Sequence, residues 1–126
     1  MSANFRMKSN RYSLFENLFS DRTNGQRAHH FQMTQENDYN TFVGCVAVGT
    51  GLQDDNESDE DGYRFYQGGR YNVFIGCKAQ YTRAGFQNWN GARAQQFVGC
   101  VAKGCRTYGF ASLANQDDCT WTNCQA

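Results

Sequence analysis

The fold is decided by three stretches that read almost alike: NTFVGCVA (40–47), NVFIGCKA (72–79) and QQFVGCVA (95–102). Two looser copies, SLFENLFS (13–20) and CTWTNCQA (119–126), keep the same order of residue types. In every copy the third position is aromatic, the fifth is Gly or Asn, and the eighth is small. This agreement marks an internal repeat, and a repeat of this length is typical of a solenoid.

A second repeated feature lies upstream of each copy, where one aromatic position recurs: Phe5, Phe31, Tyr63, Phe86 and Phe110. These residues mark the starts of about five predicted coils, near residues 5, 31, 63, 86 and 110. The stretch between one copy and the next aromatic varies in length. A solenoid is expected to take its insertions in this way, in one loop of an otherwise constant coil.

The residue types within the repeat predict strands. Aromatic and β-branched residues bounded by Gly, Asn and Asp favour short strands. The repeated Gly or Asn suits a left-handed backbone conformation, which other residues reach only at a cost. A bend there turns the aromatic, the cysteine and the small residue toward one interior, and like residues then stack at the strand spacing of about 4.8 Å. We therefore predict an all-β fold, a right-handed parallel β-helix that forms a single domain over residues 1–126.

The composition excludes several other classes. The chain has 126 residues, no net charge and 15% aromatic residues, which does not fit a disordered protein. It has no apolar stretch of about 18 residues, so we expect no membrane insertion. The N-terminal MSANFRMKSN lacks the apolar region of a secretory signal. Because the net charge is zero and the aromatic residues are needed for the core, we expect no nucleic-acid partner.

The pattern Asn-x-Phe-x-Gly-Cys-x-Ala, followed downstream by Gly-Phe, resembles the right-handed parallel β-helix of the pectin-lyase-like superfamily over residues 5–126. That superfamily includes polysaccharide lyases, glycoside hydrolases, epimerases and bacteriophage tailspikes. The resemblance implies the fold and an extracellular or virion-associated protein. It provides no catalytic residues, because no lyase or polygalacturonase motif can be matched here. One departure is that cysteine stands where such families often stack asparagine at the turn.

Four cysteines share one position of the repeat: Cys45, Cys77, Cys100 and Cys124. Neighbouring thiols in this column would lie about 5 Å apart in the interior. That spacing is compatible with disulfides, but buried cysteine also packs as a small hydrophobic residue. We favour a ladder of free thiols, which fits folding in a reducing cytoplasm. Cys105 and Cys119 lie outside the column and have no predicted role.

Residues that alternate with interior positions should point outward from a strand. In the third and fourth coils this rule and the neighbouring turns bring together one set of candidate glycan-binding residues: Arg64, Tyr66, Arg70, Gln87, Trp89 and Arg93. Exposed aromatic rings beside amide groups suit sugar rings and hydroxyls, and guanidinium groups suit the carboxylates of acidic sugars. The alternative is that Tyr66 and Trp89 pack under a neighbouring loop or subunit.

The loop TGLQDDNESDEDG (50–62) is the only strongly charged segment. Its alternating carboxylates make a weak candidate site for Ca²⁺: Asp54, Asp55, Asp59 and Asp61. The EF-hand register is missing, because Phe65 stands at the twelfth position from Asp54, where that motif needs Glu. We therefore favour a solvated insertion and predict no cofactor and no other metal site.

These observations lead to two hypotheses about function. The first is a carbohydrate-recognising β-helix segment of a tailspike-like or extracellular polysaccharide-degrading protein. The alternative is a purely structural or adhesin solenoid that mediates oligomer or shaft assembly. An active protein of this kind would be a polysaccharide lyase or glycoside hydrolase, but we expect this segment alone to be inactive.

The expected partners follow from the first hypothesis and from the ends of the repeat. The partner is a polysaccharide or glycan. The sequence shows no capping segment at either end, and a solenoid needs its ends covered. We therefore expect a homotrimer, or further β-helix coils at both ends of a longer protein.

Overall fold

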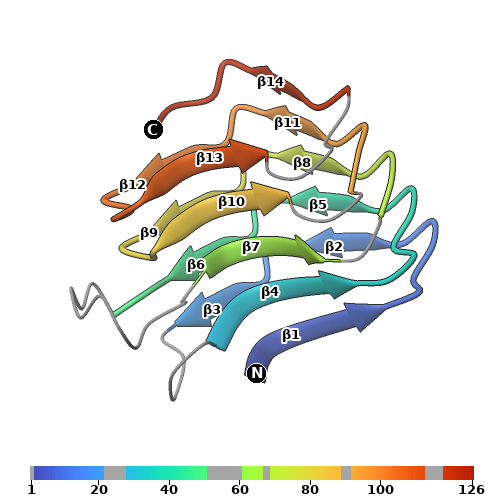
Figure 1. The fold of residues 1–126 in the computed structure, drawn as a ribbon, viewed down its shortest axis with the longest axis horizontal. Helices are drawn as coiled ribbons and strands as arrows, with labels where there is room; N and C mark the ends of the chain where they lie inside the picture. Colours follow the sequence, from blue (N-terminus) through green and yellow to red (C-terminus); the bar gives the residue numbers. More distant parts are fainter. Residues whose placement is uncertain (1, 22–27, 51–60, 67–68, 89–91, 113–117) are drawn as a thin grey trace.

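Short parallel strands, stacked in three sheets, make up the structure (Figure 1). The computed structural model describes residues 2–21, 28–50, 61–66, 69–88, 92–112 and 118–126. The strand orders are β1-β4-β7-β10-β13 in the first sheet, β14-β11-β8-β5-β2 in the second and β12-β9-β6-β3 in the third. All pairs of named strands are parallel. Neighbours in a sheet are therefore three elements apart in the chain, which is the arrangement of a β-solenoid.

The strands are short and similar within each sheet. The first sheet contains β1 (Ser2–Lys8), β4 (Ala28–Thr34), β7 (Asp61–Tyr66), β10 (Ala84–Asn88) and β13 (Tyr108–Ser112). The second contains β2 (Leu14–Glu16), β5 (Thr41–Val43), β8 (Val73–Ile75), β11 (Gln96–Val98) and β14 (Thr120–Thr122). The third contains β3 (Phe19–Asp21), β6 (Val46–Val48), β9 (Lys78–Gln80) and β12 (Val101–Lys103).

The chain runs through the first, second and third sheets in turn and then rises to the next rung (Figure 1). The path is right-handed, as nearly all parallel crossovers are. The predicted all-β, right-handed β-helix is confirmed. Within the described ranges, the structure has no helix of the length and apolarity needed to cross a membrane.

Because the strands pair in parallel register, residues of the same type stack on one another in the interior, one from each rung. Phe31 pairs with Phe5 on one side and with Tyr63 on the other, and their rings stack with centroids 5.0 and 4.8 Å apart. A second column includes Phe42 and Phe74, whose centroids are 4.6 Å apart. The two columns meet edge to face, so few aliphatic residues are needed to fill this core.

The repeated Gly or Asn position forms the corner between the second and third sheets. Its residues all have positive φ: Asn17 (54°), Gly44 (62°), Gly76 (60°), Gly99 (61°) and Asn123 (52°). The predicted left-handed column is therefore confirmed. All six cysteines are free, and three of the four that directly follow this corner, Cys45, Cys77 and Cys100, are buried. Their thiols donate to carbonyl groups of the preceding rung, as Cys77 does to Phe42 at 3.5 Å.

A buried amide ladder, which the repeat did not lead us to expect, runs beside the second sheet. Asn72 Oδ1 accepts the backbone N–H of Asn40 at 2.9 Å, and Gln95 Oε1 accepts that of Asn72 at 3.1 Å. The Asn72 amide also donates to the carbonyl of Asn37 at 2.7 Å. The ladder fixes the corner that leads into the second sheet, and it carries the exposed residues described next.

Candidate functional site

Three exposed tyrosines stack in a column at the corner between the first and second sheets. Tyr12, Tyr39 and Tyr71 have relative exposures of 77%, 47% and 51%. Neighbouring ring centroids are 5.1 Å apart in both pairs, with interplanar angles of 9° and 14°. Their spacing follows the rungs of the solenoid, so the column presents ring edges and phenol groups to solvent at regular intervals.

The backbone holds these tyrosines in an uncommon conformation. Tyr12, Tyr39 and Tyr71 have φ values of 54°, 58° and 58°. A left-handed conformation costs an ordinary residue about 1–2 kcal/mol. Hydrogen bonds support it, because Tyr39 N–H donates to the carbonyl of Arg70 at 3.0 Å. Backbone strain of this kind concentrates at functional sites, which makes the column a candidate site.

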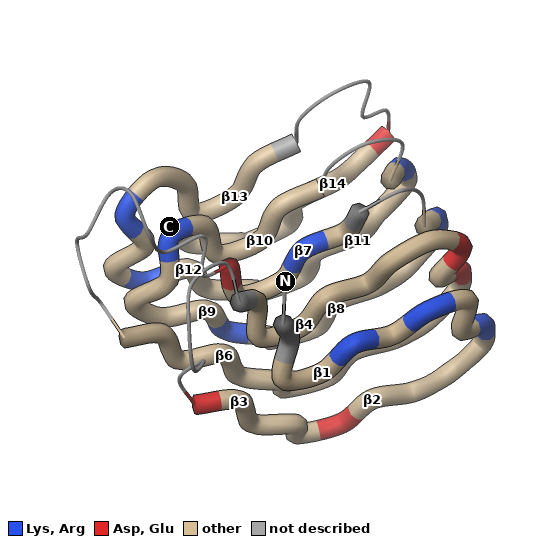
Figure 2. Tube along the Cα trace, turned by 60° about the horizontal axis from the view of Figure 1, so that its bottom comes forward, with Lys and Arg blue, Asp and Glu red and all other residues tan. Residues whose placement is uncertain are grey.

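In the chain, a charged residue stands directly before each tyrosine of the column, and these charged residues form a row beside it. Backbone bridges link Arg11 to Asp38 and Arg70 to Arg93. Asp38 is almost fully buried, and its Oδ2 lies 3.7 Å from Nη2 of both Arg11 and Arg70. Its Oδ1 also accepts the backbone N–H of Arg70 at 2.9 Å. Figure 2 shows basic and acidic positions following one another along this corner, at the right of the view.

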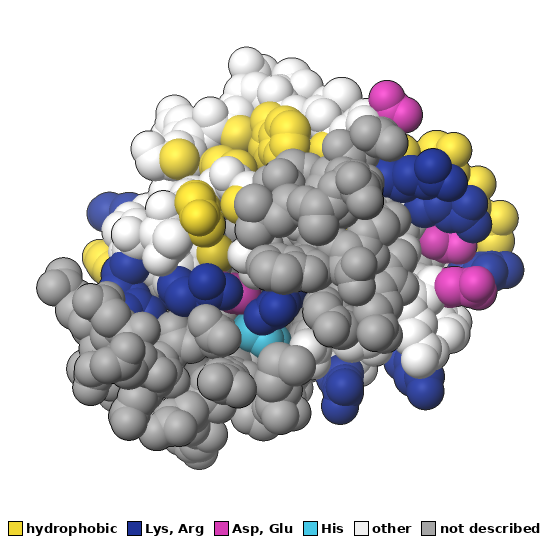
Figure 3. Space-filling view, viewed as in Figure 1, with side chains coloured by type: hydrophobic (Ala, Val, Ile, Leu, Met, Phe, Trp, Pro, Cys, Tyr) yellow, Lys and Arg dark blue, Asp and Glu magenta, His cyan; other side chains and the backbone are white. Residues whose placement is uncertain are grey.

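At the Arg70–Arg93 end of this row two basic residues stand on neighbouring rungs, and exposed Asp118 follows at the same corner on the next rung. Both arginines are exposed, and within the described ranges Arg93 has no ion pair. Arg11, besides its contact with Asp38, pairs with Glu36 at 3.1 Å in an exposed contact, which stabilises little. We call the surface formed by Tyr12, Tyr39, Tyr71, Arg70 and Arg93 the tyrosine–arginine strip. Figure 3 shows basic and hydrophobic side chains close together at the right edge of the molecule.

The predicted glycan-binding residues fall into separate groups. Arg70 and Arg93 lie side by side on the strip. Arg64 and Gln87 pair in register on the first sheet, but their exposures are only 9% and 1%. The prediction that they are exposed is therefore wrong. The side chain of Tyr66 and the whole of Trp89 lie outside the described part of the chain.

Arg64 belongs to a buried polar cluster at the start of the first sheet. Its Nη1 donates to His29 Nε2 at 3.2 Å and lies 3.4 Å from Asp61 Oδ2. Arg83 Nη2 lies 2.9 Å from Asp61 Oδ1. A carboxylate removed from water needs such cationic partners. Figure 3 shows a histidine and an acidic side chain among basic ones on this face.

The predicted C-terminal end of the acidic loop is wrong, as the position of Asp61 shows. The loop was expected to reach residue 62 in solvent, but Asp61 is fully buried and begins β7. The other candidate Ca²⁺ ligands, Asp54, Asp55 and Asp59, lie outside the described residues. Within the described ranges, no three His, Cys, Asp or Glu side chains come together in a group that could hold a metal ion.

Two buried groups of the interior, Cys77 and Tyr63, are held in their protonated form. Hydrogen bonds with Cys100 and Cys45, together with burial, hold the pKa of the Cys77 thiol far above its usual range. Burial likewise raises the pKa of Tyr63 well above its ordinary value. The Tyr63 hydroxyl donates to the carbonyl of Cys45 at 2.7 Å. These groups act as hydrogen-bond donors that join neighbouring rungs.

In comparisons with known proteins, no family model, no curated protein and no solved structure matches this chain. The strip must therefore be interpreted from its own chemistry. It combines a regular array of aromatic edges, phenol hydroxyls and guanidinium groups along one corner of the solenoid. Groups of these kinds stack on apolar faces, exchange hydrogen bonds with hydroxyl groups and pair with anions.

Proposed function

We propose that this protein is a carbohydrate-recognising β-solenoid, which binds an acidic polysaccharide along the tyrosine–arginine strip. The observation that carries the proposal is the column of three exposed tyrosines stacked at 5.1 Å beside exposed arginines. A polysaccharide is itself a repeating chain, so one lying along the strip would meet similar groups rung after rung.

The chemistry of the strip supports this ligand class. Tyrosine offers an apolar ring and a hydroxyl that both donates and accepts hydrogen bonds, which suits the mixed surface of a sugar. The rings already stack on one another, so little side-chain freedom is lost on binding. The guanidinium groups of Arg70 and Arg93 bind carboxylate or sulfate groups through charge-assisted hydrogen bonds.

The proposal is one of binding rather than cleavage. Glycoside hydrolysis needs two carboxyl groups facing each other across a cleft. On the strip, Asp38 is almost fully buried between Arg11 and Arg70, and Glu36 pairs with Arg11. A place in a tailspike-like or extracellular polysaccharide-degrading protein of the pectin-lyase-like kind remains part of this proposal, supported by the core repeat alone.

The test removes two rings of the strip without changing the backbone. Asparagine adopts positive φ readily, so Tyr39→Asn/Tyr71→Asn deletes the rings and keeps the corner. Tyr81→Asn is the matched control, because Tyr81 is 44% exposed with a φ of 57° and follows the third sheet instead. Binding is measured on an array of acidic and neutral glycans and then by calorimetry. We expect the double variant to lose binding and the control to retain it.

A second variant tests the charge preference. Arg93→Gln should weaken binding to acidic glycans, reduce its salt dependence and leave binding to neutral glycans unchanged. Binding that survives loss of both tyrosines, or no binding to any glycan, would contradict the proposal.

The structural alternative rests on a different surface. The second sheet exposes apolar side chains, with Leu14 at 58%, Ile75 at 42% and Val98 at 39%. Such a face can bury itself against another subunit. A chain that binds no glycan, and whose oligomer dissociates in Ile75→Thr/Val98→Thr, would favour a structural solenoid.

A further inference from the structure

We propose that the cysteine column in the interior binds a soft, monovalent cation of the Cu(I) type between the thiols of neighbouring rungs. The column consists of Cys45, Cys77, Cys100 and Cys124, all of which are free. This site goes beyond carbohydrate binding and does not depend on it. The sequence led us to expect only packed free thiols at these positions.

The strand pairing places these thiols one rung apart. The Cys45 carbonyl accepts the backbone N–H of Lys78 at 2.9 Å, and the Cys77 carbonyl accepts that of Val101 at 3.0 Å. Each of these two donors directly follows the next cysteine of the column. Cys45, Cys77 and Cys100 therefore lie on successive rungs, about 4.8 Å apart along the direction of strand pairing.

The side chains of the column also point the same way. Each thiol donates to the carbonyl of the inner aromatic residue on the preceding rung, at 3.6 Å for Cys45, 3.5 Å for Cys77 and 3.4 Å for Cys100. Because the same contact recurs, each side chain repeats the one before it, and the sulfur atoms follow the rung spacing as well. Since S–H is a weak donor, an ion that displaces a thiol proton breaks only a weak hydrogen bond.

The rung spacing matches linear coordination by two sulfur atoms. A metal–thiolate bond is about 2.3 Å long in zinc sites, so two such bonds in line span about 4.6 Å. An ion midway between two neighbouring sulfur atoms therefore needs no cavity and no movement of the backbone. Each pair of neighbouring thiols in the column offers one such two-sulfur site.

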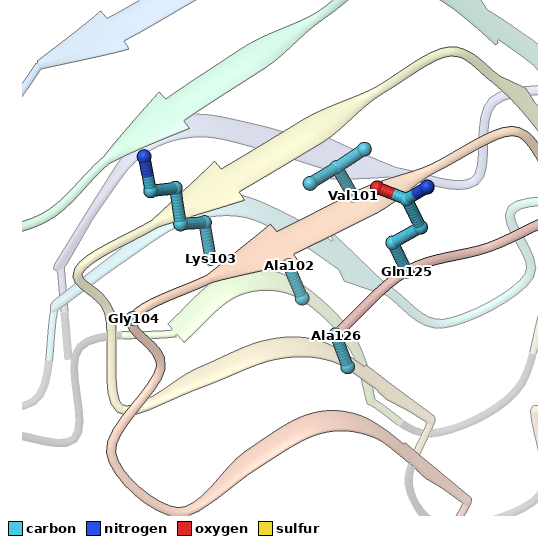
Figure 4. A pocket seen from close by; sticks show the side chains of 6 residues that line it. All are labelled: Val101, Ala102, Lys103, Gly104, Gln125 and Ala126. Atoms are coloured by element: carbon cyan, nitrogen blue, oxygen red, sulfur yellow. The ribbon is translucent and has the colours of Figure 1, made fainter.

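The surroundings of the column favour a soft ion over a hard one. Figure 4 shows Ala102 and Ala126 pointing to one side of the third sheet, and Val101 and Lys103 pointing to the other. Cys100 stands two residues before Ala102, and both are buried, so the thiols share the inner side with the alanines and the aromatic rings. Calcium and magnesium need oxygen ligands, whereas thiolate sulfur selects ions such as Cu(I).

Ligand number and charge distinguish Cu(I) from zinc. A structural zinc site needs four ligands in a tetrahedron. Among the residues that the structure describes, not even three His, Cys, Asp or Glu side chains form a group that could hold a metal ion. When one monovalent ion enters a two-sulfur site, one thiol proton leaves to solvent. The charge of the interior is then unchanged, which avoids the high cost of burying a net charge.

The test compares two variants that keep equal numbers of column thiols. Cys100→Ala/Cys124→Ala leaves Cys45 and Cys77 on neighbouring rungs. Cys77→Ala/Cys124→Ala leaves Cys45 and Cys100, which are two rungs or about 9.6 Å apart and cannot share one ion. Cu(I) is titrated without oxygen into the reduced proteins, against the coloured competing chelator bicinchoninate. We expect the first variant to bind one Cu(I) and the second to bind at least about tenfold more weakly, because even loss of a supporting residue costs a metal site about 10–100-fold.

Both variants keep Cys105 and Cys119, so binding by thiols outside the column affects them equally. Circular dichroism checks that both are folded. Wild type gives a test that needs no substitution, because X-ray absorption at the copper edge should show two sulfur neighbours at one distance.

Three results would overturn the proposal. The first is a wild type that takes no Cu(I) from the chelator, and the second is bound copper with three or more ligands. The third is a difference of less than about tenfold between the affinities of the two variants. A protein that binds glycan but no Cu(I) would overturn this metal site alone.

Discussion

Glycines at two kinds of position in the repeat differ in what a side chain would meet. Gly76 has a φ of 60°, and a Cβ there would meet no atom within 4 Å. Gly85 lies in β10 of the first sheet, where a Cβ would come 2.6 Å from the Gly109 carbonyl oxygen and 2.8 Å from the Ala102 Cβ. Gly76 is thus required for its backbone conformation, and Gly85 for close packing of two rungs.

We expect Gly76→Ala to lower the free energy of unfolding by about 1–2 kcal/mol. The left-handed backbone conformation is the only source of this loss, because the added Cβ meets no other atom. Gly76→Asn should cost less, since asparagine tolerates that conformation. Gly85→Ala should cost more than either, because backbone atoms of the next rung must move. Urea unfolding followed by circular dichroism measures all three variants. Equal losses for Gly76→Ala and Gly85→Ala would contradict this distinction.

The amide ladder shows how one short element depends on its neighbours. Asn72 accepts a hydrogen bond from the backbone of Asn40 and donates one to the carbonyl of Asn37. Because both groups are buried, Asn72→Ala leaves a donor and an acceptor without partners, at an expected cost of about 2–4 kcal/mol. Gln96→Ala, at an exposed strand position of the next rung, should change stability by less than about 0.5 kcal/mol. Chemical denaturation compares the two variants.

The strands and their interior faces could be predicted from the repeat, but exposure of the outer face could not. Alternation correctly separates Gln87 from the interior residue Phe86, yet Gln87 is 1% exposed. A two-residue period specifies which way a side chain points. It carries no information about what lies over that side, so Arg64 and Gln87 were wrongly expected to be accessible.

The tyrosine column could have been found from the sequence. In the aligned copies, Tyr12, Tyr39 and Tyr71 each stand three residues before an aromatic of the inner column. The pattern was missed because the last two copies have Ala94 and Asp118 at that position. Two of the five residues of the strip, Arg70 and Arg93, were nevertheless identified from their side-chain chemistry.

At the scale of the whole molecule, stability in a solenoid is a sum over rungs and the contacts between neighbouring rungs. Phe74 is fully buried and stacks on Phe42 and Phe97, with centroids 4.6 and 5.0 Å away. Phe15 is half-buried at one end and, among the described residues, stacks only on Phe42, at 4.9 Å. The same residue type therefore has two neighbours in the middle and one at the end.

We expect Phe74→Ala to destabilise the protein by about 3–5 kcal/mol, the range for a buried phenylalanine. Phe15→Ala should cost less than half as much, since it loses one stacking partner and less burial. Thermal and urea unfolding, measured at concentrations where the protein is monomeric, determine both values. Similar losses at the two positions would contradict a sum over neighbouring rungs.

The two ends of the chain lie at opposite ends of the stack, and the backbone hydrogen bonds between strands run along the same axis (Figure 1). A mechanical load applied between the two ends would therefore act along these bonds rather than across them. The rungs would unfold one after another, and each would unfold at a similarly low force. A molecule built in this way extends stepwise under tension, with the outermost coils giving way before the middle.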